Sequence, residues 1–195
     1  TLKFLLVASC SDHSMSHRVV SSAPGKVILF GEHAVVHGVT AVAASLSDLR
    51  IYVDVATTSS TKGLCIHLHD FGEAGEQKEP FIVQYSDLRE SLGDLLKESS
   101  SGSPATPENP GEEYLAPLRE RFESYANHAA HGLMAIGYLM VKILPELVNE
   151  ANSSEGGNGG VGLSIDVKSI GLPIGGGLGS SAAFSGCLSA ALLRM

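Results

Sequence analysis

One run of residues near the end of the sequence has the composition of a phosphate-binding loop. Residues 173–183 read PIGGGLGSSAA, so that four glycines in five positions precede two serines. Glycine permits left-handed backbone conformations, and a ligand can approach its main chain closely because no Cβ intervenes. We expect a helix to follow, capped by Ser180 or Ser181, with its first N–H groups directed toward an anion. The run therefore predicts a site for nucleotide phosphates.

Other loops have similar compositions. The run is not a Walker A loop, because no Gly-Lys-Ser/Thr sequence follows the glycines. It does fit G-x-G-x-x-A at Gly177, Gly179 and Ala182, a variant of the dinucleotide-binding fingerprint. The acidic residue of that fingerprint, expected about 20 residues later, would lie beyond Met195. A plain hinge between a strand and a helix is the structural alternative, and the serines at the predicted helix start favour phosphate binding over it.

A second group of chemically capable residues lies at 23–38, APGKVILFGEHAVVHG. Lys26 stands at the head of an apolar strand, where its ammonium could reach a phosphate or an attacking oxygen. Glu32 and His33 follow in a glycine-bounded turn, a usual place for functional side chains. Taken singly, each has an ordinary explanation: a lysine stem lying on apolar surface, a turn carboxylate, a structural imidazole. Their close succession favours a functional site.

These two motifs resemble those of the mevalonate kinase family, whose superfamily also includes galactokinase, homoserine kinase and phosphomevalonate kinase. Residues 173–183 resemble the superfamily's phosphate-binding motif, and residues 23–38 resemble the N-terminal motif of mevalonate kinases in particular. The resemblance covers the N-terminal portion only. It implies an α+β fold like domain 2 of ribosomal protein S5, without the family's C-terminal domain. It also implies ATP-dependent phosphorylation of the primary hydroxyl of mevalonate to 5-phosphomevalonate, a step toward isoprenoids and sterols.

The resemblance further implies a role for each motif residue. Lys26 would be the catalytic cation beside the reacting hydroxyl, Ser181 would be a Mg²⁺ ligand, and Glu32 and His33 would lie on the substrate side. The ATP phosphates would be bound by Lys26, Gly175, Gly176, Gly177, Leu178, Gly179, Ser180 and Ser181. The family's aspartate base and a second Mg²⁺ ligand would lie beyond Met195. Expected partners are mevalonate, ATP and a second copy in a homodimer, and the expected location is the cytoplasm, with peroxisomes as a further compartment.

Strands and turns must position these motifs. Residues 19–30 predict a strand interrupted at Pro24 and Gly25, and residues 31–38 predict a compact turn. Residues 41–56 alternate as a second strand. After a turn at Lys62 and Gly63, a third short strand is expected opposite the second. A strand at 163–167 leads into the glycine-rich loop. The apolar positions that define these strands are Leu49, Ile51, Val53, Val55, Leu64, Ile66, Leu68, Leu163, Ile165 and Val167.

Helical patterns fill the remainder, which makes the predicted class α+β. Ser86 is predicted to cap a helix that carries one apolar stripe, formed by Leu88, Leu92, Leu95 and Leu96. Helical pattern resumes near Tyr114 and is strongly apolar at 129–147. Residues 182–193 predict a buried helix that reaches the end of the sequence without a stop signal, which favours a truncated chain.

Bulk composition narrows the function classes. The chain has 195 residues, a net charge of −8 and 44% hydrophobic residues, which allows a packed core and disfavours nucleic acid as a partner. Three cysteines without C-x-x-C spacing predict neither disulfides nor a zinc site. No stretch predicts a membrane span. We expect a disordered extension at 1–17 and an ATP-binding kinase domain at 18–195 with a low-complexity insertion at 98–113.

Two other function classes remain open. A dinucleotide-binding oxidoreductase would share the strand–loop–helix pattern, but the loop comes late and the Gly-Glu-His segment would be unexplained. A truncated product that binds nucleotide without turnover would follow from a missing catalytic base, whose loss costs about 10²–10⁴-fold in rate. Another small-molecule kinase of the same superfamily is a third possibility.

Overall fold

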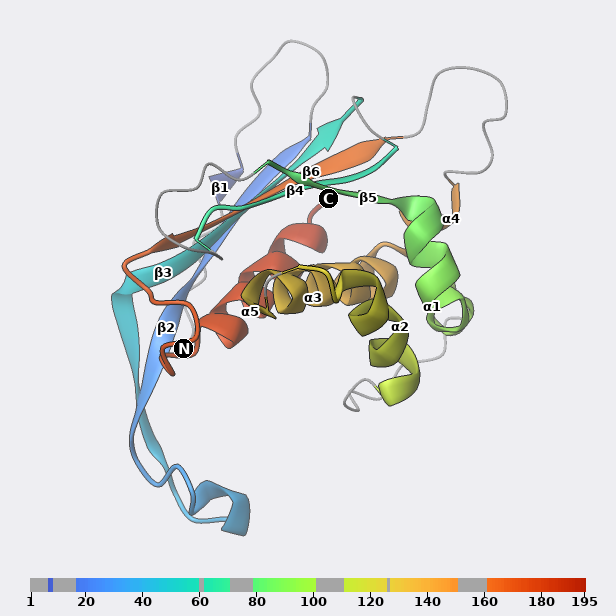
Figure 1. Cartoon of the computed structure of the whole chain (residues 1–195). Helices are drawn as coiled ribbons and strands as arrows, with labels where there is room; N and C mark the ends of the chain where they lie inside the picture. Colours follow the sequence, from blue (N-terminus) through green and yellow to red (C-terminus); the bar gives the residue numbers. More distant parts are fainter. Residues whose placement is uncertain are drawn as a thin grey trace.

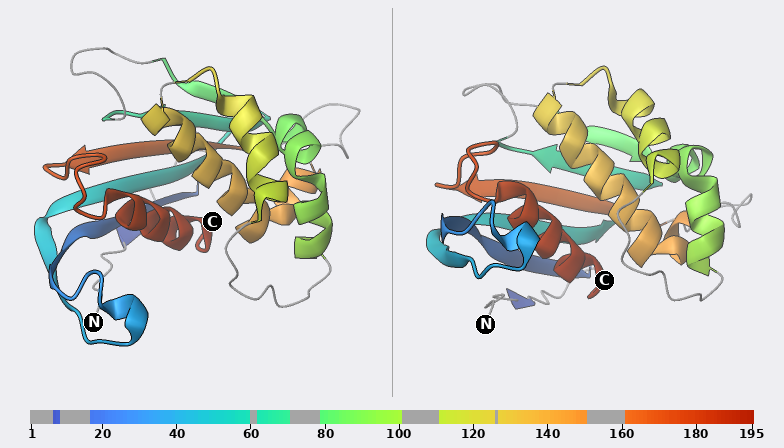
Figure 2. Two further views of the ribbon diagram at one scale, coloured as in Figure 1. Left: turned by 60° about the horizontal axis from the view of Figure 1, so that its bottom comes forward. Right: turned by 90° about the horizontal axis from the view of Figure 1, so that it is seen from below.

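A computed structural model describes residues 7–8, 17–59, 62–70, 79–100, 111–125, 127–150 and 161–195. In these residues one mixed sheet, with the strand order β1-β2-β3-β6-β4-β5, is covered on one face by helices (Figures 1 and 2). The predicted α+β class is confirmed. The strands are β1 (Val7–Ala8), β2 (Arg18–Phe30), β3 (Val42–Thr58), β4 (Gly63–Leu68), β5 (Phe81–Gln84) and β6 (Gly162–Ile170). The helices are η1 (Val35–His37), α1 (Tyr85–Ser100), α2 (Glu112–Phe122), α3 (Asn127–Ile143), α4 (Pro145–Glu150) and α5 (Ser180–Leu192).

The sheet order corrects one sequence prediction. The β4 strand was expected to pair with β3, but β6 lies between them, antiparallel to β3 and parallel to β4. The direction of β4 relative to β3 is therefore that of a hairpin, although no ladder joins the two. The turn signal at Lys62 and Gly63 is local, and it carries no information about a strand that arrives about 100 residues later with its own apolar face.

The core lies between the sheet and the helices. Alternate residues of the three central strands face the helices and are at most 2% exposed: Ile51, Val53, Val55, Leu64, Ile66, Leu68, Leu163, Ile165 and Val167. Opposite them, α1 buries its predicted stripe of Leu88, Leu92, Leu95 and Leu96. Full burial of each such side chain contributes about 1.5–3 kcal/mol. The α1 helix begins at Tyr85, so Ser86 lies within its first turn and the predicted cap there is wrong. Instead, the Asp87 carboxylate accepts a 3.3 Å hydrogen bond from the backbone N–H of Gln84.

The β2–β3 hairpin continues beyond the helical layer as an arm, seen at the lower end of Figure 1. The pairing of the two strands shifts at Pro24/Gly25, where three residues of β3 bulge out between Leu46 and Arg50. Arg50 holds this bend: its guanidinium donates to the Ser22 carbonyl and hydroxyl at 3.2 and 3.0 Å and to the Ser47 carbonyl at 3.3 Å. The arm thus leaves the sheet at a fixed place, just where Lys26 stands.

The predicted domain limits fall largely on residues that the structure does not describe. Most of 1–17 and residues 101–110 of the expected insertion lie outside the described ranges. Within the N-terminal segment, Val7 and Ala8 pair with Val20 and Val19 as β1. No helix in the described part of the chain is long and apolar enough to span a lipid bilayer.

Candidate functional site

The two motifs meet where β2 passes the glycine-rich loop. The backbone N–H of Lys26 donates a 2.8 Å hydrogen bond to the carbonyl of Leu178. A Cβ on Gly25 would lie 2.9 Å from that carbonyl oxygen and 2.5 Å from Leu172 Cδ1, so only glycine permits this approach. The tertiary fold therefore brings the Pro-Gly-Lys segment and the loop between β6 and α5 into direct contact.

The Lys26 side chain lies along Gly179, the last residue before α5. Gly179 has φ +74° in the left-handed region, and a Cβ there would lie only 2.7 Å from Lys26 Cγ. The stem of the lysine therefore passes the first turn of α5, while the side chain remains exposed at its end. Among the described residues, the Lys26 ammonium has no hydrogen-bond or ion-pair partner. A cation that is held by its stem but unpaired at its tip is suited to receive an anionic ligand.

The start of α5 differs from the prediction that a serine caps it. Gly179 is the N-cap, and no side chain caps the helix. Ser180 is 6% exposed and its hydroxyl accepts a 3.4 Å hydrogen bond from the Gly175 N–H, which folds the loop back onto the helix start. Ser181 is exposed. With no capping side chain, the amides of the first turn and the positive end of the helix dipole are available to an anion.

A cavity of about 530 Å³ opens beside Lys26 and the first turns of α5. Its polar lining comes from the side chains of Lys26, Ser45, Ser47 and Arg50, with no carboxylate among the lining residues. The other side is formed by small residues, namely Ala23, Pro24, Gly25, Ala43, Ala44, Gly179, Ala182, Ala183 and Gly186. Two cations and two hydroxyls around a space of this size suit a small anionic molecule.

A second cavity of about 170 Å³ lies on the α3 side of the loop. Gly175, Ser180 and Ser181 line it from the loop and α5, and His131 lines it from α3. Since Gly179 lines the first cavity and Gly175 the second, the loop separates two spaces. A phosphate chain bound along the loop would have room for an acceptor on one side and for the rest of a nucleotide on the other.

Glu32 and His33 are not brought to either cavity. Both are exposed near the tip of the arm, beside η1, and neither belongs to the lining residues. Their assignment to the substrate side stays a prediction. The arm also exposes several large apolar side chains: Leu29, Phe30, Val35, Val36, Val39 and Val42.

Sequence reasoning missed several lining residues. Arg50 could have been noticed as a cation interrupting an apolar strand, and Ser45 and Ser47 as hydroxyls two residues apart on one strand face. His131 lies in an apolar helical segment and carries no comparable signal. Within the described ranges, no group of three or more histidine, cysteine, aspartate or glutamate side chains is arranged to hold a metal ion.

Comparison with known proteins shows which enzymes this chain resembles. No family model matches the chain. It is, however, 34% identical over 178 residues to mevalonate kinase of Candida albicans, a match that covers 90% of the chain. Human and mouse mevalonate kinases are 35% and 34% identical over 93% and 92% of the chain. This chain is mevalonate kinase-like. It spans 37–40% of the length of these three relatives.

The similarity to mevalonate kinases is not confined to the two motifs, because the matched segments cover nine-tenths of the chain. A mevalonate kinase from Pyrococcus furiosus is also 31% identical over 85% of the chain. The relatives thus include fungal, mammalian and Pyrococcus enzymes, and the resemblance first noted at the two motifs is confirmed along the sequence.

Proposed function

We propose that this mevalonate kinase-like chain carries the phosphate-binding half of a site that transfers phosphate from ATP to the primary hydroxyl of mevalonate, giving 5-phosphomevalonate. The observation that carries the proposal is the contact between Lys26 and Gly179 at the start of α5. It places an unpaired cation next to uncapped helix amides. Phosphoryl transfer depends on this combination, because its catalysis is mostly positioning and compensation of charge.

In the proposed complex the loop amides and the N-terminus of α5 bind the triphosphate, through residues 175–181. Lys26 reaches the transferring group from the side of the larger cavity, which receives the acceptor. The cationic lining of that cavity favours an acceptor with a negative charge, and mevalonate carries a carboxylate. Glu32 and His33 are proposed to approach the acceptor from the arm.

The described residues fit Mg²⁺ only as an ion shared with the nucleotide. Mg²⁺ is usually bound through few protein oxygens together with phosphates and water, and the exposed hydroxyl of Ser181 can supply one such oxygen. When bound, the ion would neutralise negative charge on the triphosphate. The general base is proposed to come from outside the two cavity linings, since neither contains a carboxylate.

Further properties of the family are proposed with less direct support from the chain. These are a fold like domain 2 of ribosomal protein S5, homodimer formation, action in isoprenoid and sterol synthesis, and a cytoplasmic or peroxisomal location. The first is supported by the mixed sheet with helices on one face. The others follow only from the similarity to mevalonate kinases.

A second candidate function is nucleotide binding without turnover. The observation that favours it is the lack of a carboxylate in either cavity lining, so that no aspartate or glutamate there can accept the hydroxyl proton. Both candidates require that the loop binds ATP, and they differ only in turnover.

The test combines binding and activity. Binding of Mg²⁺ and a non-hydrolysable ATP analogue is measured by titration calorimetry. Formation of 5-phosphomevalonate is measured by mass spectrometry, both with this chain and with a form extended by the C-terminal part of a relative such as human mevalonate kinase. We expect Lys26→Met to lower turnover by roughly 10²–10³-fold, as loss of one charge-stabilising donor does in other enzymes. Lys97→Met is the matched control, because Lys97 is exposed on α1 and paired with Asp94. Binding without product would select the second candidate, and the lack of both would refute both.

A further inference from the structure

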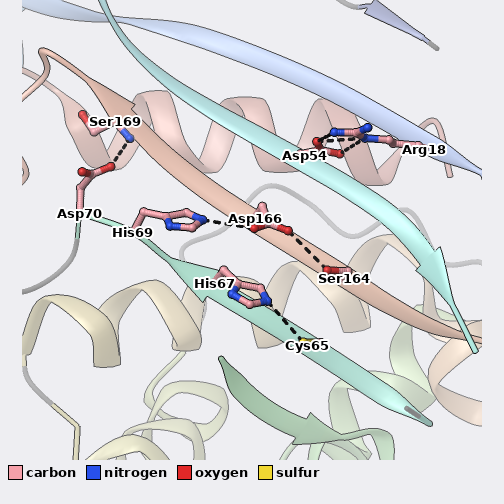
Figure 3. Close-up of polar contacts among 9 residues, drawn as sticks. All are labelled: Arg18, Asp54, Cys65, His67, His69, Asp70, Ser164, Asp166 and Ser169. Atoms are coloured by element: carbon pink, nitrogen blue, oxygen red, sulfur yellow. Dashed lines mark hydrogen bonds and ion pairs between the residues drawn. The ribbon is translucent and has the colours of Figure 1, made fainter. Parts of the chain in front are cut away.

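The face of the sheet that points away from the helices carries a row of metal-binding side-chain types. Cys65 and His67 on β4, and His69 directly after the strand ends, alternate with the buried Leu64, Ile66 and Leu68, so all three project from the outer face. On the neighbouring strand β6, Asp166 stands in register with His67 (Figure 3). Registered residues on adjacent strands are separated by only about 4.7–4.9 Å along the ladder direction.

These side chains form two contacting pairs. The Nε2 atom of His69 lies 3.2 Å from Asp166 Oδ1, and the Nε2 atom of His67 lies 3.6 Å from Cys65 Sγ. The two imidazole rings are nearly parallel, with an interplanar angle of 14° and centroids 6.0 Å apart. The second oxygen of Asp166 accepts a 3.4 Å hydrogen bond from the Ser164 hydroxyl. The carboxylate is thereby held between the two strands.

Neighbouring acidic groups are already occupied. Asp54 is paired with Arg18, and Asp70 accepts a 2.6 Å hydrogen bond from the Ser169 N–H (Figure 3). Among the described residues, Asp166 has hydrogen bonds only with His69 and Ser164, and the charge of the Arg18 guanidinium also acts on its carboxylate. His69 and Asp166 have half-exposed side chains, at 50% and 44%, so an ion from solvent can reach them.

We propose that His67, His69 and Asp166 form a surface binding site for a divalent transition-metal ion, with Zn²⁺ as the reference ion. Two imidazoles and a carboxylate are a ligand set that Zn²⁺ accepts, with water in the fourth position. In the present side-chain conformations, these three residues are not arranged to bind one metal ion together, and neither is any other such group among the described residues. Completion of the site requires the His67 ring to turn from Cys65 toward Asp166, its partner in register.

That rearrangement is within reach of the fold. It turns one half-buried side chain and leaves both strands in place. Cys65 is not assigned as a ligand. It is four residues from His69, and because a strand rises about 3.3 Å per residue, the two side chains are too far apart to bind the same ion. Mg²⁺, which prefers oxygen ligands, should not compete for this site.

The test is calorimetric titration of the chain with Zn²⁺ in buffer at neutral pH, with and without excess Mg²⁺. We expect one ion bound per chain, unaffected by Mg²⁺, and binding weakened by roughly tenfold or more in His67→Ala and in His69→Ala. Cys65→Ala should retain the wild-type affinity. The matched control is His37→Ala, which removes an exposed histidine on the arm, away from this sheet face.

Each contrary result would overturn the assignment. Absence of Zn²⁺ binding by the wild-type chain would exclude the site, and wild-type affinity in the His67 and His69 variants would place the ion elsewhere. Loss of binding in Cys65→Ala would indicate a thiolate site instead. Circular dichroism of every variant confirms that the fold is retained, which we expect because the substituted histidines project from the outer face of the sheet.

Discussion

The contact between Lys26 and Gly179 can be tested by adding a single methyl group. Alanine at position 179 would have to adopt φ near +74°, which costs about 1–2 kcal/mol for a residue with a Cβ. Its Cβ would also lie 2.7 Å from Lys26 Cγ and 3.2 Å from Cε. Because Cγ is close to the backbone of β2, the lysine must leave its path or the loop must shift. We expect Gly179→Ala to lower the free energy of unfolding by about 2–5 kcal/mol, the sum of the backbone cost and a cost of overpacking of about 1–3 kcal/mol.

Two glycines provide matched controls for the free-energy cost of a positive φ angle. Gly177 and Gly38 have φ of +73° and +79°, and a Cβ at either would meet no atom within 4 Å. Gly177→Ala and Gly38→Ala should therefore cost only about 1–2 kcal/mol each. Gly38 lies beside η1 on the arm, away from the loop. Comparison of its variant with Gly177→Ala therefore shows whether backbone strain has a different effect when it lies in the glycine-rich loop.

The assay is urea unfolding followed by circular dichroism, combined with titration of the ATP analogue. A double-mutant cycle adds Lys26→Ala, which removes Cγ and Cε and should recover the part of the loss that exceeds the backbone cost. We also expect Gly179→Ala to weaken binding of the ATP analogue by more than Gly38→Ala does. The same loss of stability in the 179, 177 and 38 variants, with no coupling to Lys26→Ala, would refute the contact and the site built on it.

Three further predictions concern the elements around the site. Ile165→Ala should lower the free energy of unfolding by about 2–5 kcal/mol because Ile165 is fully buried, whereas Ile82→Ala, at a side chain 48% exposed, should cost much less; urea unfolding of both variants tests this. Arg50→Leu removes the hydrogen bonds to Ser22 and Ser47 that hold the bend, so amide exchange measured by mass spectrometry should accelerate in residues 24–47 but not in α1. Burial raises the pKa of Cys187 from 9.0 to about 12, so its thiol ionises in the unfolded chain before it does in the folded one. The resulting stability is complete below pH 9 and is lost as the pH rises toward 12, and Cys187→Ala should flatten the decline that pH-dependent urea unfolding records over this range.

Much of the fold was predictable because its signals are periodic. The alternation of apolar residues in β3, β4 and β6 and the leucine stripe of α1 each specify one buried face, and the structure buries those residues. The partner of each strand was less predictable. The turn at Lys62 and Gly63 suggested a hairpin, but the ladder next to β4 is formed by β6, because strand pairing depends on which apolar faces meet across long sequence separations.

The candidate site, like the fold, was predictable from the sequence only in part. Glycine density and the two serines predicted the loop, since few residue types can form its left-handed turns. The serine cap was wrong because Ser180 folds back to Gly175, a contact that depends on how the loop closes. Arg50, Ser45, Ser47 and His131 became part of the site only through packing of β3 and α3 beside the loop.

The two motifs, the α+β class and the apolar faces could be read from the residues alone, because each depends on residue types at short spacing. Folding, in contrast, brings Lys26 against Gly179 and Arg50 into the same cavity, and it leaves Glu32 and His33 apart on the arm. It also brought His67 and Asp166 into register on the outer face of the sheet. The physical reason is that local backbone preference acts over a few residues, whereas a binding site is assembled by contacts between segments far apart in the chain.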